Sequence, residues 1–256
     1  MPDWSDLDRE LDRWAAEGRA ASFWWRDDDA TRATPSLDRL LALRNEAKAP
    51  LAIAVIPGRA EPALALRLAR ETDIAVLQHG WLHLNHAPPG APKAELGAHR
   101  PAAFILGELA RGRLAMDRLF GRAWLDVLVP PHNRIAREVA SGLPLAGYSG
   151  LSTYDARGTA IRGLVQVNAH IDIMDWTTRA FVGVEIALAL ALRHLGARRA
   201  GSIDADEPTG LLTHHLAHDG PAWDFTTAFL SRVAAHPAAR WSAAPALFQP
   251  TGADRA

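Results

Sequence analysis

Strand-like and helix-like segments alternate along nearly the whole of this 256-residue chain. The strand-like segments are short and apolar, whereas the helix-like ones carry leucines at helical spacing. We expect strands at residues 21–26, 51–56, 74–78, 125–129, 145–151, 163–168 and 210–213. We expect helices at residues 5–16, 35–48, 62–70, 101–121, 178–195 and 223–235. Such alternation builds a parallel sheet with crossover helices, so the sequence predicts an α/β fold of about seven parallel strands, open or closed into a barrel.

No linker, repeat or low-complexity block divides the chain. We therefore expect one domain over residues 1–250 and a disordered tail at residues 251–256. Ser5 is the expected N-cap of the first helix, and Gly196 the expected C′ residue of the helix that ends at residue 195. Residues 87–100, which are rich in Pro, Gly and Ala, predict a long loop of the kind that is often functional.

The chain carries 28 Lys and Arg against 29 Asp and Glu, and it has no cysteine. This charge balance argues against nucleic-acid binding through bulk charge and against polybasic attachment to a membrane. The lack of cysteine excludes disulfides, thiolate metal sites and a cysteine nucleophile. A metal site in this protein must therefore use His, Asp and Glu.

The N-terminal 20 residues show no basic start followed by an apolar run, which is the pattern of an export signal. The longest apolar stretch, residues 181–192, is too short to span a bilayer. These observations predict a cytoplasmic protein without nucleic-acid or membrane partners. They leave its oligomeric state open.

Polar residues gather where the expected strands end. An Asp run, 27–29, follows the first strand, and the windows 79–86 and 214–218 after two later strands hold six of the eleven histidines. Ligands of parallel α/β folds bind at the carboxyl ends of the strands. We therefore expect these residues to meet in one site.

His79 and His83 have the H-x3-H spacing, which lets two side chains on one helical turn hold the same ion. A carboxylate from the Asp run would complete a set of two His and one Asp, with positions left for water, as in catalytic metal sites. The alternatives are a pair of surface histidines and a solvated acidic turn. Strand alternation allows only one of His214 and His215 to face the site.

In this order, these motifs resemble those of the polysaccharide deacetylase family, also called carbohydrate esterase family 4 or NodB-like. The resemblance covers about residues 21–215 and lies in five short motifs. It implies a distorted (β/α) barrel, usually of seven strands. It also implies removal of acetyl groups from N-acetyl sugars with a divalent metal, which would be zinc, with cobalt, manganese or nickel as alternatives.

By this resemblance, Asp27 is the catalytic base and Asp28 a metal ligand, together with His79 and His83. A shift by one residue, which would make Asp29 the ligand, is an open alternative. Each of these roles is carried over from the family's first and second motifs.

The third motif reads Val129 to Asn133 and lacks the Arg that orients the base in the family. The resemblance places Pro131, His132 and Asn133 at the oxyanion and the substrate, through a backbone N–H beside His132. Asn133 is a candidate to orient the base instead. In the second motif, Gly80 replaces the usual Ser or Thr, with the loss of one supporting hydrogen bond.

The fourth motif, Asp-x-x-Asp-Trp, matches Asp172, Asp175 and Trp176, and the fifth, Leu-x-x-His, ends at His214. The resemblance makes His214 the acid that protonates the leaving amine, with Asp175 tuning it. His215 is the alternative acid. Trp176 and Leu212 would contact the substrate.

The resulting hypothesis is a metal-dependent hydrolase that removes an acyl group, most simply acetyl, from an N-acylated sugar or a related amide. The resemblance implies a small-molecule or glycan substrate. Without an export signal, we expect a soluble sugar, a nucleotide sugar or a lipid-linked precursor. Deformylation or hydrolysis of another small amide is equally open. The main alternative is a non-catalytic carbohydrate- or metal-binding relative, which the missing Arg favours. An iron oxygenase is disfavoured, because the His-x-Asp ligand spacing is absent from the second motif.

Overall fold

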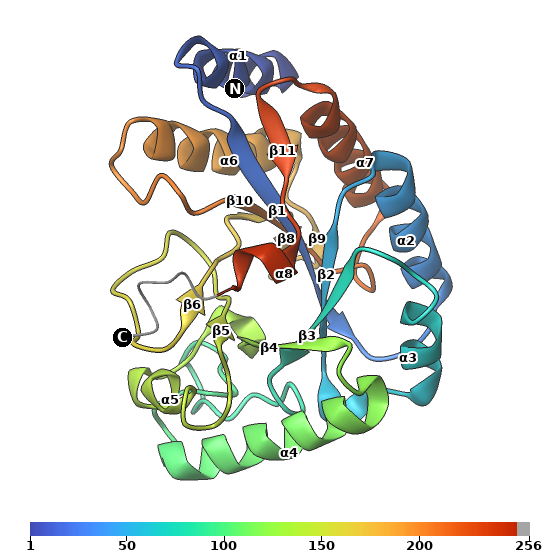
Figure 1. Ribbon diagram of the computed structural model, residues 1–256, viewed down its shortest axis with the longest axis vertical. Coiled ribbons are helices and arrows are strands. Elements are labelled where there is room, and N and C mark those ends of the chain that lie inside the picture. The colour runs from blue at the N-terminus through green and yellow to red at the C-terminus, as the bar shows by residue number, and fades with distance from the viewer. Residues whose placement is uncertain (250–256) are drawn as a thin grey trace.

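The computed structural model describes residues 1–249, and a curled parallel sheet forms its centre (Figure 1). The strands of this sheet are β1 (Ala21–Ala30), β2 (Leu51–Val55), β3 (Ile74–His79), β4 (Trp124–Val129), β5 (Gly150–Leu151), β6 (Val165–Gln166), β7 (Ile171–Asp172), β10 (Thr209–Thr213) and β11 (Ala239–Trp241). Their order is β6-β5-β4-β3-β2-β1-β10-β7, and β11 pairs with β1. A separate antiparallel hairpin joins β8 (Met174–Asp175) to β9 (Ala180–Phe181).

Helices surround the curled sheet on its outer side (Figure 1). They are α1 (Trp4–Ala16), α2 (Pro35–Ala47), α3 (Pro62–Leu68), α4 (Ala102–Phe120), α5 (Arg137–Gly142), α6 (Val184–Arg199) and α7 (Gly220–Ala235). The short helix α8 (Ala244–Leu247) instead lies inside the curled sheet and packs in the same cluster as Trp24 (Figure 1). Two short 3₁₀ helices, η1 (Pro57–Arg59) and η2 (Pro131–Asn133), follow β2 and β4. Within the described residues, the path of paired strands ends at β6 and β7, so the barrel stays open there. The expected α/β fold, a distorted barrel of parallel strands, is confirmed.

Two buried layers flank β1, because its side chains alternate between the faces of the sheet. Phe23 and Trp25 pack outward in the large cluster between sheet and helices. Trp24 packs inward against Val129 and Phe248, in the smaller cluster inside the barrel. This alternation brings Arg26, which is fully buried, to the inner side.

Several expected boundaries differ from the structure. The N-cap of α1 is Asp3, not Ser5, and it forms a capping box with Asp6. The helix expected at residues 178–195 begins only at Val184, because the β8–β9 hairpin precedes it, and it continues past Gly196 to Arg199.

The strands expected at residues 145–151 and 163–168 have only two residues each, and β11 was not expected. The single domain over residues 1–250 stays a prediction, and the tail expected at 251–256 lies outside the described residues. None of the helices in the described part of the chain is long and apolar enough to cross a membrane.

Candidate functional site

A cavity of about 850 Å³ lies where the carboxyl ends of several strands meet. It collects polar residues from β1, β3, β4, β7 and β10 or from the segments that follow them: Asp28, Asp29, His79, His83, His132, Asn133, Asp172, Trp176 and His214. The expectation that these segments form one site is met by the geometry, although individual residues lie differently from what the motifs implied.

A bulge in β1 explains how two consecutive carboxylates reach the same cavity. The pairing of β1 with β2 shifts between Asp27 and Ala30, and Asp29 adopts a left-handed backbone with a φ of 72°. Regular alternation would send Asp28 and Asp29 to opposite faces of the sheet. With the bulge, both line the cavity.

The carboxylate beside the two motif histidines belongs to Asp29, not to Asp28. Its Oδ1 lies 3.2 Å from Nε2 of His79 and 3.2 Å from Nε2 of His83, and these three residues form a group whose ligand atoms could hold one ion. Nδ1 of His79 lies 3.0 Å from the carbonyl of Val129. If Nδ1–H donates to that carbonyl, Nε2 is left free to bind a metal, as in many metal sites.

The charges of these three residues suit a cation. Burial opposes ionisation of Asp29, yet its pKa lies well below the usual range because His79, His214 and His83 are close. Burial and neighbouring His79 lower the pKa of His83, so His83 is in its neutral, ligating form near pH 7. Burial acts to lower the pKa of His79, but the neighbouring Asp28 and Asp29 outweigh burial, so the pKa of His79 is raised. One carboxylate and two imidazoles form a ligand set that fits a divalent metal such as zinc.

Asp28 is 1% exposed and pairs with the buried guanidinium of Arg26. Nε of Arg26 lies 2.9 Å from Asp28 Oδ1, and Nη2 donates to Oδ2 at 3.1 Å. The same Nη2 donates to Oδ1 of Asn133 at 2.7 Å, while Nη1 donates to the carbonyls of Ser152 and Thr153. Arg26 therefore fixes the direction of Asp28.

Glu95 anchors the loop that carries His83. Although it lies in the Pro- and Gly-rich segment, it is 1% exposed. Its carboxylate accepts from the backbone N–H groups of Trp81 at 3.0 Å, Leu82 at 2.8 Å and Leu84 at 3.3 Å. These bonds hold the backbone on both sides of His83 in place.

Gly80 itself is required by space and by its backbone. Its φ is +58°, and a Cβ at this position would collide with the Glu95 carboxylate and the ring of Pro131. The departure from the family's second motif and the presence of Glu95 thus belong to the same arrangement.

Asp27 points away from the cavity and pairs with His215. Its Oδ1 contacts Nδ1 of His215 at 2.5 Å, and its Oδ2 accepts from Thr213 Oγ1 and from the N–H of His215. Burial disfavours charge on both residues, but their mutual attraction outweighs it. The pKa of Asp27 is therefore lowered, and the pKa of His215 is raised. Asp27 does not line the cavity, so it does not lie where the expected base would act.

His214 faces the cavity, and Trp176 stands beside it. Their rings meet edge to face with centroids 4.5 Å apart, and Trp176 is 48% exposed. The indole of Trp176 donates to Asp172 Oδ2 at 3.0 Å, so Asp172 holds the Trp that contacts His214.

Asp175 and Leu212, which were also expected at the site, do not line the cavity. Asp175 accepts from the N–H of Thr177 and the hydroxyl of Thr178, and so it caps the turn between β8 and β9 instead of facing His214. Leu212 is fully buried within β10 and does not line the cavity. Both differences follow from local geometry, the first from a turn and the second from strand alternation.

The last three residues of the third motif form η2. His132 and Asn133 line the cavity, whereas Pro131 is buried against Gly80. His132 and Asn133 have φ angles of 59° and 54°. The His132 ring packs edge to face on His83, with centroids 4.6 Å apart. Burial and the neighbouring His83 and His79 lower the pKa of His132 to about 4, so the ring is neutral near pH 7.

Sequence reasoning missed three of these residues. Arg26 carried a signal, since a lone cation at the end of an aromatic, buried strand needs a buried partner. Asp172 occupied the first position of the fourth motif but was not assigned a role. Glu95 gave no signal, because it stands in a segment without periodicity.

Comparison with solved structures identifies the fold. The chain is similar to a protein assigned to the polysaccharide deacetylases from Mycobacterium smegmatis, with 18% identity and a TM-score of 0.62 over 90% of this chain and 88% of that one. It is similar to the peptidoglycan deacetylase PdaC from Bacillus subtilis, with 14% identity and a TM-score of 0.54 over 84% of each chain. A family 4 acetyl xylan esterase from Clostridium thermocellum, in complex with a cobalt ion, has 12% identity and a TM-score of 0.51 over 82% of each chain.

No protein-family model and no curated protein matches the sequence. At these low identities the likeness establishes the fold alone, because one fold can host different activities. The resemblance to the polysaccharide deacetylases is confirmed at that level.

Proposed function

We propose that this protein is a metal-dependent hydrolase that removes an acyl group, most simply acetyl, from an N-acylated sugar or a related amide. The observation that carries the proposal is one cavity that holds the Asp29–His79–His83 group together with Asp28 and His214. The fold, which the chain shares with deacetylases and esterases, also supports the proposal.

In this proposal, Asp29, His79 and His83 hold the cation. A divalent metal at such a group supplies Lewis-acid polarisation of the acyl carbonyl and activation of water. Zinc suits two imidazoles and one carboxylate, and cobalt, manganese and nickel are the alternatives.

Asp28 acts as the general base that accepts the proton of the attacking water. We assign this role to Asp28 instead of Asp27 because, of these two residues, Asp28 lines the cavity and Asp27 does not. Arg26 holds Asp28 in place. It also explains how the chain can lack the third-motif Arg and still orient a base.

His214 donates a proton to the departing nitrogen, and a backbone N–H beside His132 stabilises the oxyanion. Trp176, half-exposed at the rim, offers an aromatic face to the sugar. The positions of Trp176 and His214 in one cavity allow the sugar to stack while its amide reaches the acid.

The non-catalytic alternative was favoured by the missing Arg. The pairing of Arg26 with Asp28 removes that argument, and a binding protein would need no buried, oriented carboxylate beside a metal group. We therefore keep the hydrolase as the proposal.

The test uses Asp27→Asn, Asp28→Asn and Asp29→Asn, each assayed for bound metal by mass spectrometry and for acetate release from N-acetylglucosamine oligomers and monomers. We expect Asp29→Asn to lose the metal, and Asp28→Asn to keep it but lose at least about 100-fold in turnover. Asp27→Asn serves as the matched carboxylate variant outside the cavity. Wild-type turnover in Asp28→Asn, with metal bound, would refute the base assignment.

A further inference from the structure

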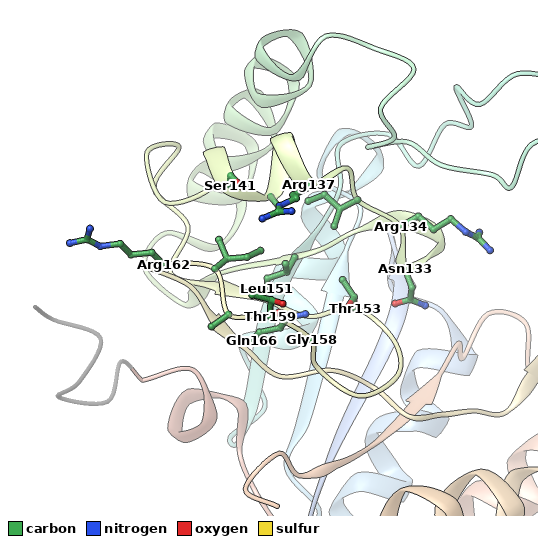
Figure 2. A pocket seen from close by; sticks show the side chains of 14 residues that line it. Asn133, Arg134, Arg137, Ser141, Leu151, Thr153, Gly158, Thr159, Arg162 and Gln166 are labelled. Carbon is green, nitrogen blue, oxygen red and sulfur yellow. The ribbon is translucent and has the colours of Figure 1, made fainter. Parts of the chain in front are cut away.

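A second cavity of about 870 Å³ adjoins the first. It lies between η2, α5, β5, β6 and the segment that leads from β5 to β6 (Figure 2). Asn133 and Arg134 line both cavities, so the two cavities meet at these residues. A ligand held at the metal group could therefore extend past Asn133 into the second cavity.

The lining of the second cavity is cationic. It contains Arg134, Arg137 and Arg162, and it contains no Asp or Glu. Within residues 1–249, none of the three forms an ion pair with a carboxylate. Figure 2 shows Arg137 over Leu151, with the guanidinium groups of the other two reaching outward from opposite sides.

A further cation lies at the junction. Nη1 of Arg134 donates to the backbone carbonyl of Lys93 at 3.1 Å, and Lys93 lines the first cavity. Two cationic residues, Lys93 and Arg134, therefore lie where the two cavities meet. Like charges gathered around a concave surface raise its positive potential and attract anions.

The remaining polar groups of the second cavity are neutral, including Ser141, Thr153, Thr159 and Gln166. Hydroxyls and amides can donate hydrogen bonds to phosphate oxygens, and the planar guanidinium matches two of these oxygens at once. All three arginines are exposed, so an anion would gain charge-assisted hydrogen bonds from them that a neutral sugar would not. The lining therefore fits a phosphate or diphosphate better than an uncharged sugar.

We propose that the second cavity binds the phosphate or diphosphate of an N-acylated amino sugar whose acyl group lies at the metal group. The anion site stands on the lining itself, whereas its link to the acyl group rests on the function proposed above. The substrate class is then a sugar phosphate, a nucleotide sugar or a lipid-linked sugar diphosphate.

The first experiment measures binding of inorganic pyrophosphate by calorimetry at low ionic strength. It compares the wild type with Arg137→Gln/Arg162→Gln and with Arg111→Gln/Arg118→Gln, which removes two exposed charges from α4. We expect the first double variant to bind at least tenfold more weakly, and the α4 variant to bind like the wild type. Equal weakening in both variants, or none in either, would overturn the proposal.

The second experiment compares deacetylation of N-acetylglucosamine 1-phosphate with that of N-acetylglucosamine. We expect the wild type to prefer the phosphate, and Arg137→Gln/Arg162→Gln to lose this preference through KM, with kcat on the neutral sugar unchanged. A UDP-linked sugar and a geranyl-diphosphate-linked sugar separate the nucleotide from the lipid source. An unchanged preference in this variant would overturn the substrate assignment.

The two proposals fail separately. Pyrophosphate binding that depends on Arg137 and Arg162, without hydrolysis of any N-acyl sugar, would refute the proposed function and leave the anion site. Hydrolysis of neutral N-acetyl sugars, without pyrophosphate binding, would do the reverse.

Discussion

Arg26→Met tests the buried ion pair that orients Asp28. Both side chains are almost fully buried, and removal of one partner leaves the other charge without compensation. Such losses cost about 3–5 kcal/mol. For a protein of this size, each kcal/mol corresponds to a shift of roughly 2–4 °C in Tm, so we expect Tm to fall by roughly 6–20 °C.

The assay is a double-mutant cycle with Arg26→Met, Asp28→Asn and the double variant, measured by urea denaturation of metal-free protein. The double variant has no buried charge left at this place. Its loss should therefore be smaller than the sum of the single losses by about 2 kcal/mol or more. Arg118→Met, on the exposed face of α4, is the matched control and should change stability by no more than about 0.5 kcal/mol.

Additive losses, within about 0.5 kcal/mol, would show that the two residues do not interact. A loss below about 1 kcal/mol in Arg26→Met would refute the reasoning from burial. Arg26→Lys keeps the charge but cannot reach Asp28, Asn133 and the Ser152 carbonyl at once. It should fold while it lowers turnover more than metal content.

Three further changes probe other parts of the structure. Gly80→Ala should lower Tm and weaken metal binding, since its Cβ would meet the Glu95 carboxylate; wild-type values in thermal unfolding and chelator competition would contradict this. Glu95→Ala leaves three backbone N–H groups near His83 without their acceptor, so metal affinity should fall about 10–100-fold in the same competition assay. Burial and the neighbouring His170 lower the pKa of His194 to about 2, below its unfolded value of about 6.5. Because only the unfolded chain then takes up this proton, the stability of metal-free protein should fall as pH drops below about 6.5, by at most about 1.4 kcal/mol per unit from this group. His194→Gln should make the dependence of the urea midpoint on pH shallower, and an identical dependence would exclude His194 as its source.

The general placement of the site could be predicted from the sequence, because it follows from chain topology. A parallel sheet brings the ends of its strands to one edge, whatever the details of each strand. The segments that contain Asp29, His79, His83 and His214 therefore converge as expected.

The choice among neighbouring residues could not be predicted in the same way. A bulge in β1 decides which of the three consecutive carboxylates meets the histidines, and the motif alone leaves Asp28 and Asp29 both open. Arg26 pairs with Asp28 two residues further along the same strand. Its other partners, Asn133, Ser152 and Thr153, come from distant segments. His215, the partner of Asp27, follows the neighbouring strand β10. The expectation that Asp175 faces His214 fails for a related reason. Its carboxylate accepts a hydrogen bond from the backbone N–H of Thr177 in the turn that follows.

The open seam of the barrel has a consequence for how the protein behaves at high concentration. A sheet with free edges can pair with the edge of another molecule and grow into an aggregate. Here the strands at the two ends of the path, β6 and β7, have only two residues each. Such short edges offer few backbone groups as a template, so the chain can leave its barrel unclosed without exposing a long edge to intermolecular pairing.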